Sequence, residues 1–225
     1  MKFGFSFLLI GLLSGNAIAQ KCDGFYLLQN GKTITMSNYG RKDKPTGTVV
    51  YKISDVKKVG SGLSAKINTQ VFDDKQESVS TGEATVECSG GQYKVDMRMM
   101  LNQQQTKQLK KYKGKMDFFV EYPAGMKVGE VLKDASFTLS GEESDGIGAD
   151  MEVTIDERTV LAQEKVTTPA GTWDCFKIKS HVTMKASMSG ISIPFSTDNI
   201  EWFAPGFGIV KTETKSSRSE ISSIQ

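Results

Sequence analysis

Histidine is nearly absent from the sequence: His181 is the single one among 225 residues. Serine and cysteine hydrolases commonly use a histidine to move the proton, and no Gly-x-Ser-x-Gly elbow accompanies this one. On an alternating strand, His181 shares its face with Thr183 and Lys185, so we interpret it as a polar surface residue. We therefore expect a protein that is not an enzyme, although the 26 acidic residues leave a carboxylate pair open.

Patterns for metals, cofactors and nucleic acids are also missing. Zinc sites usually combine several Cys or His at close spacing, whereas here the three Cys and the one His lie far apart. Gly206-Phe207-Gly208 follows a proline and is typical of a turn, and residues 141–150 lack the oxygen-ligand spacing of an EF-hand. The 28 basic and 26 acidic residues are interleaved without a basic stripe. We expect no metal, no cofactor and no nucleic-acid partner.

No apolar run is long enough to cross a bilayer, which takes roughly 20 residues. The run at 3–13 follows Lys2 and precedes Ala17-Ile18-Ala19, the three parts of a signal peptide. The sequence predicts a signal peptide at 1–19, cleavage between Ala19 and Gln20, and a mature chain without a transmembrane span in the periplasm or outside the cell. Acylation of Cys22 is an alternative that Lys21 disfavours.

Cysteine is scarce, but an exported chain meets an oxidising compartment in which disulfides form. Cys22, Cys88 and Cys175 allow three pairings and also three free thiols. We favour a Cys22–Cys88 disulfide, because it would tie a loose N-terminus to a strand. Cys175 lies among aromatic residues, which suggests that it is buried.

Alternating polar and apolar residues predict many short strands, which favours a mainly β fold. In the clearest, 181–188, Val182, Met184, Ala186 and Met188 share one face. The other predicted strands, separated by Gly, Asp, Asn and Pro turns, are 32–38, 48–56, 63–72, 83–88, 93–99, 116–121, 136–140, 151–155, 159–166, 173–179, 200–203 and 208–214.

A lysine- and glutamine-rich stretch at 102–113 is interpreted as a short surface helix. We expect residues 20–225 to form a single β-rich domain, with two lobes meeting near 123–129 as an alternative. Aromatic and sulfur-bearing side chains could line an apolar cavity or simply fill the core. They are Met97, Met99, Met100, Phe118, Phe119, Trp173, Phe176, Met184, Met188, Phe195, Trp202 and Phe203.

Two sequence segments in the second half of the chain resemble segments of the exported bacterial TapB-like proteins. They are Val-Thr-Thr-Pro-Ala-Gly-Thr-Trp-Asp-Cys-Phe-Lys-Ile at 166–178 and Glu-Trp-Phe-Ala-Pro-Gly-Phe-Gly-Ile-Val-Lys at 201–211. Residues 47–53 and 86–88 agree with the N-terminal part of that family. The resemblance implies a large, curved antiparallel sheet, an open half-barrel similar to lipoprotein carriers, and it transfers no active site.

Two hypotheses for the function follow. The first is a non-catalytic cell-envelope protein that binds an apolar ligand or a lipid-bearing partner on a concave sheet face. The second is an interaction module that scaffolds a surface or secretion assembly by pairing through exposed strand edges.

Overall fold

The computed structural model describes residues 22–100, 119–141, 149–188 and 191–225. Its strands, in chain order, are β1 (Thr33–Tyr39), β2 (Pro45–Val59), β3 (Gly62–Phe72), β4 (Ser78–Ser89), β5 (Gln92–Asp96), β6 (Phe119–Pro123), β7 (Ala135–Gly141), β8 (Ala149–Thr168), β9 (Gly171–Met188), β10 (Ile191–Ala204), β11 (Gly208–Thr214) and β12 (Arg218–Ile224). The helices in this part of the chain are the 3-10 turns η1 (Cys22–Gly24), η2 (Tyr26–Leu28), η3 (Arg41–Asp43) and η4 (Met97–Met100). The helix predicted at 102–113 lies outside the described residues.

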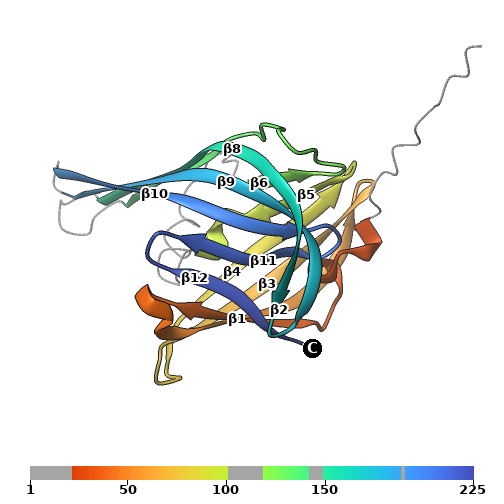
Figure 1. Cartoon of the computed structure of the whole chain (residues 1–225), viewed down its shortest axis with the longest axis horizontal. Helices are drawn as coiled ribbons and strands as arrows, with labels where there is room; N and C mark the ends of the chain where they lie inside the picture. Colours follow the sequence, from red (N-terminus) through yellow and green to blue (C-terminus); the bar gives the residue numbers. More distant parts are fainter. Residues whose placement is uncertain (1–21, 101–118, 142–148, 189–190) are drawn as a thin grey trace, which may run out of the picture.

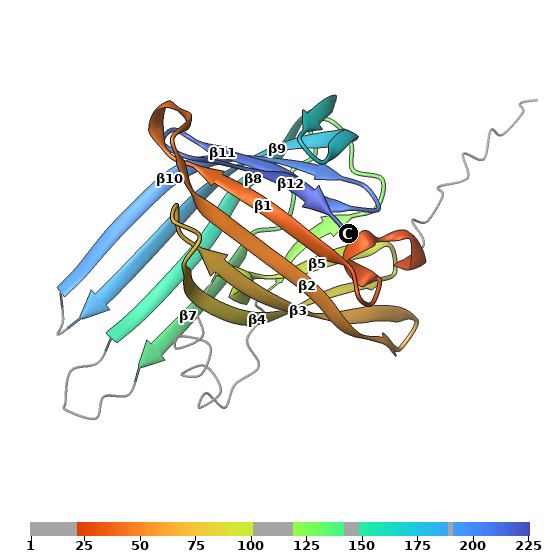
Figure 2. The ribbon, with the colours of Figure 1, turned by 90° about the horizontal axis from the view of Figure 1, so that it is seen from below.

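All twelve strands belong to one antiparallel sheet in which consecutive strands pair with each other, except β6 and β7 (Figure 1). The order is β6-β5-β4-β3-β2-β1-β12-β11-β10-β9-β8-β7, so β1 pairs with β12 and the two edges are β6 and β7. The predicted curved antiparallel sheet is confirmed, and it closes beyond a half-barrel into a nearly complete barrel (Figure 2). Residues 124–134 connect its two edge strands.

The strand boundaries differ from the prediction in instructive places. β8 and β9 each join two predicted strands, because a bulge at Asp156/Thr159 shifts the register of β8 without ending it. β12 and the first half of β10 are strands for which the sequence pattern gives no prediction. Residues 97–99, predicted to end a strand, belong to η4.

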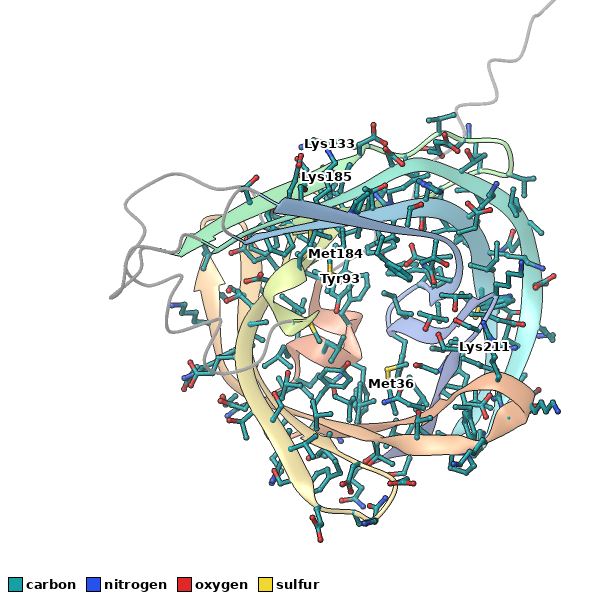
Figure 3. All side chains as sticks on the ribbon, turned by 90° about the vertical axis from the view of Figure 1, so that its left-hand side faces the viewer. Met36, Tyr93, Lys133, Met184, Lys185 and Lys211 are labelled. Atoms are coloured by element: carbon teal, nitrogen blue, oxygen red, sulfur yellow. A yellow bond between two sulfur atoms is a disulfide. The ribbon has the colours of Figure 1, made fainter. Side chains whose placement is uncertain are left out.

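The N-terminal turns η1 and η2 close one end of the barrel, and we call residues 22–28 the plug. Phe25, Leu27 and Leu28 of the plug are buried, and the Tyr26 amide donates to the carbonyl of Gly206 at 2.9 Å. Seen from the opposite end, the plug lies within the ring of strands (Figure 3).

A disulfide fixes the plug to the wall, as the sequence analysis favoured. Cys22 is bonded to Cys88 of β4 across 66 residues, with their Cα atoms 5.5 Å apart. Cys175 is free and buried, and burial raises the pKa of its thiol to about 12. The thiol is therefore protonated and unreactive at neutral pH.

At the other end, four strands run beyond the barrel as a flat sheet (Figure 2). We call this part the extension. It consists of β7, residues 149–156 of β8, residues 181–188 of β9 and residues 191–198 of β10.

Candidate apolar site

Stacked aromatic rings form a floor inside the barrel, above the plug. Phe25 of the plug stacks on Tyr93 of β5 with ring centroids 4.5 Å apart, and Tyr122 of β6 stacks on Phe203 of β10 at 4.4 Å. Tyr93 and Phe203 join the two stacks at 5.9 Å. These rings pack against one another and thereby fill the closed end of the barrel.

A buried ion pair lies beside this floor. Arg158 of β8 is 0% exposed, and its Nη2 lies 3.7 Å from Oε1 of Glu201 on β10. The Tyr122 hydroxyl donates to Glu201 Oε2 at 3.1 Å, and the guanidinium lies 5.0 Å from the Tyr122 ring. Burial raises the pKa of Glu201 although Arg158 and Tyr122 oppose the shift, and burial also raises the pKa of Tyr122. The three groups therefore depend on one another for their polar partners.

The bulge in β8 explains why Arg158 points inward. Between Asp156 and Thr159, two residues of β8 lie opposite the single residue Ser180 of β9, so one residue is extra, and Glu157 adopts a φ of 51°. Bulges redirect side chains in this way, and non-glycine residues with positive φ are uncommon. The charged guanidinium consequently lies on the same inner side as Val160, which is fully buried.

The inner face of the extension is apolar across all four strands. Cross-strand pairing places Phe137, Val153, Met184 and Phe195 in one row. In the next row towards the barrel, the same pairing gives Ala135, Ile155, Val182 and Thr197. Met184 points towards the interior with Met36 and Tyr93 (Figure 3). This face is continuous with the inside of the barrel.

Exposure rises along the first row from one edge to the other. Phe137 is 5% and Val153 2% exposed, Met184 is half-buried, and Phe195 is 63% exposed. A phenylalanine with most of its surface in water marks an apolar face that the described residues leave partly uncovered.

The outer face of the extension is polar and carries the single histidine. His181 Nδ1 lies 3.0 Å from Asp198 Oδ1, and Lys185 bonds Glu152 at 3.2 Å. The hydrogen bond to Asp198 is the main cause that raises the pKa of His181, and it likewise lowers the pKa of Asp198. The predicted polar-face position of His181 is confirmed.

The aromatic and sulfur-bearing residues singled out from the sequence divide among several environments. Phe203 and Phe176 are buried with the core, Met97 is buried in η4, and Trp173 packs against the core. Trp202 lies on the opposite face from its neighbours Glu201 and Phe203, between Lys177 and Lys211, and donates to Glu164 at 2.6 Å.

Four residues of that set lie on the inner face of the extension or outside the description. Met184 and Phe195 belong to the apolar row. The strand pairing places Met188 opposite Ile191, and Phe118 lies outside the described residues. The sequence analysis missed the Arg158–Glu201 pair, since a charged residue in a strand predicts a solvent-facing position.

In the part of the chain that the structure describes, no three His, Cys, Asp or Glu side chains gather as metal ligands would. Nor is any described helix long and apolar enough to span a membrane. The predicted cleavage site, Ala19 and Gln20, lies outside the described residues.

A family model matches residues 29–225. The chain belongs to the DUF3108-like family. The narrower TapB-like likeness stays a prediction. Among curated proteins, none matches this chain.

Two solved structures share the fold of this family member. One is a candidate exported protein from Bacteroides fragilis with a YmcC-like fold, 23% identical, with a TM-score of 0.68. The other is a candidate lipoprotein from Parabacteroides distasonis, 21% identical, with a TM-score of 0.69. Each comparison covers 88% of this chain and 96% of the other.

Proposed function

We propose that the chain is an exported, non-catalytic binding protein that holds the apolar part of a lipid or lipid-bearing partner on the inner face of the extension. The observation that carries this proposal is the row Phe137, Val153, Met184 and Phe195, which ends in an exposed aromatic ring. The descriptions of the two similar structures, as candidate exported protein and candidate lipoprotein, support the location.

The shape of the molecule favours an elongated apolar ligand. The inner face runs along β10 from Glu201 to Phe195, which is about 20 Å at 3.3 Å per residue. One leaflet of a bilayer provides about half of a 30 Å hydrocarbon core. An acyl chain of membrane length therefore fits along this face.

Native mass spectrometry of protein purified gently from its own envelope provides the first test. Bound lipid masses support the proposal, and a ligand-free protein opposes it. Binding of the uncharged fluorophore 1-N-phenylnaphthylamine then locates the site. Phe195→Glu is expected to weaken binding about tenfold, because burial of a phenylalanine contributes about 1.5–3 kcal/mol.

Ser196→Glu is the matched control, because Ser196 is also exposed but belongs to the polar outer face. It places the same charge one residue away and is expected to leave binding unchanged. Equal binding by the wild type and both variants would contradict the site.

A second candidate, strand addition by a partner protein, is favoured by the sequence of β7. Within the described residues, β7 pairs with β8 alone, and Ala-Ser-Phe-Thr-Leu-Ser-Gly contains none of the charges or prolines that protect natural edges. The purification above tests it: one protein partner captured without lipid favours this function, and Thr138→Pro in β7 should then abolish the capture.

A further inference from the structure

In the described residues, the barrel wall is interrupted between its two edges. β6 ends the sheet on one side. On the other, residues 129–132 and then β7 lie along β8: the Leu132 amide donates to the Arg158 carbonyl at 2.8 Å, and β7 pairs with 149–155. We call the boundary between β6 and this segment the seam. No strand ladder joins β6 to β7 among the described residues, whereas ladders join all other neighbours in the sheet.

One buried side chain bridges the seam. Arg158 Nη1 donates to the Glu121 carbonyl of β6 at 3.0 Å and to the Lys133 carbonyl, just before β7, at 2.8 Å. On the outer side, Lys133 Nζ lies 3.5 Å from Glu121 Oε1. Side chains thus provide the attachment that backbone hydrogen bonds provide elsewhere in the wall.

The position of Arg158 is also where both partners of β8 are irregular. The bulge interrupts pairing with β9 between Asp156 and Thr159, and on the other side the pairing breaks between Val131 and Ala135. Bulges are frequent next to functional sites. Glu157 is a non-glycine residue with a positive φ, a strained backbone conformation that is found in switch regions. A wall attached by side chains rather than by a strand ladder has two discrete arrangements, bonded and released.

We propose that the seam is the line along which the barrel wall opens to admit and release the apolar ligand, and that Arg158 is the positioning residue that holds it closed. This inference rests on the proposed function. Opening moves β6 outward and takes Tyr122 from Glu201, so the interior beside the aromatic floor becomes reachable from the side. Charge-assisted hydrogen bonds re-form when β6 returns.

A chemical lock across the seam tests the proposal. Glu121→Cys and Lys133→Cys are joined by a short bismaleimide, while Cys175 is buried and Cys22 and Cys88 are bonded to each other. We expect association and release of 1-N-phenylnaphthylamine to slow at least tenfold, with an unchanged dissociation constant. The same double variant with each cysteine capped by a monofunctional maleimide is the control: it lacks both the cross-link and the Lys133–Glu121 pair, so it should exchange at least as fast as the wild type.

If the locked protein exchanges the fluorophore at the wild-type rate, the ligand does not enter through the seam, but the proposed function is not contradicted. If the unlocked protein binds no fluorophore and no lipid, the proposed function fails, and with it the entry route.

Hydrogen exchange provides a readout that does not depend on a ligand. Arg158→Lys keeps the charge but cannot donate to two carbonyls from one planar fork, so amides of β6 should exchange at least tenfold faster. Arg218→Lys is the matched control, since Arg218 bonds Asp43 and Glu220 beside the continuous β1–β12 ladder. Unchanged exchange of β6 in Arg158→Lys would overturn the role of Arg158.

Discussion

The two ends of the barrel use apolar side chains in opposite ways. At the plugged end, Phe25, Tyr93, Tyr122 and Phe203 stack on one another, and a disulfide fixes the segment that covers them. In the extension, strands of the same sheet carry an equally apolar face, yet Phe195 remains 63% exposed. One end is therefore packed closed, and the other leaves part of its apolar face exposed.

The largest expected difference between the two ends is in how much the free energy of unfolding falls when an aromatic ring is removed. Phe203→Ala should lower the free energy of unfolding by about 3–5 kcal/mol, because it leaves a cavity in a packed floor. Phe195→Ala should change it by less than about 0.5 kcal/mol, as expected for an exposed side chain. Urea unfolding measures both. A comparable loss from Phe195→Ala would mean that the extension is packed like the floor.

Removing the disulfide should have the next largest effect and should affect only the plugged end. Cys22→Ser with Cys88→Ser should cost about 4 kcal/mol, since the bond closes a loop of 66 residues in the unfolded chain. Hydrogen exchange should increase in residues 22–28 and remain unchanged in β7. Cys175→Ala is the control, and equal stability of the two variants would argue against a structural role for the disulfide.

The smallest effect concerns the outer face of the extension. Because Asp198 raises the pKa of His181, the imidazolium–carboxylate pair stabilises the fold below the ordinary pKa of histidine, about 6.5, and this contribution is lost as pH rises through the raised value. NMR can follow the single imidazole directly. Asp198→Asn should lower its midpoint, whereas Glu152→Gln, which removes the partner of Lys185, should not. An unchanged midpoint in Asp198→Asn would show that the pair does not form in solution.

Alternation was sufficient to predict the regular parts of the sheet. Residues 181–188 have one apolar and one polar face, and the structure places Met184 and His181 on them as expected. β12 was missed because Arg-Ser-Glu-Ile-Ser-Ser-Ile has little strand signal of its own. It forms because β1 and β11 pair with it from both sides, a tertiary effect that local propensity does not contain.

The polar part of the interior could not be predicted for a different reason. A bulge changes the face of the sheet on which a side chain lies, and no sequence pattern near Glu157 predicts a bulge. Arg158 therefore lies inside although its residue type favours solvent. Glu201 lies inside with Phe203, whereas Trp202, which the sequence places with the apolar residues, lies on the opposite face of β10.

The pairing of β1 with β12 constrains how the chain can fold. Ile34 meets Ile224, so the contact joins residues 190 positions apart in the chain. Contacts of such high sequence separation form slowly because the entropy of closing the loop must be lost first. The hairpins within each half can form early, but the ring cannot be completed until β12 pairs with β1. Until then β1 and β11 each keep an unpaired edge, and the folding chain is most prone to aggregate through them.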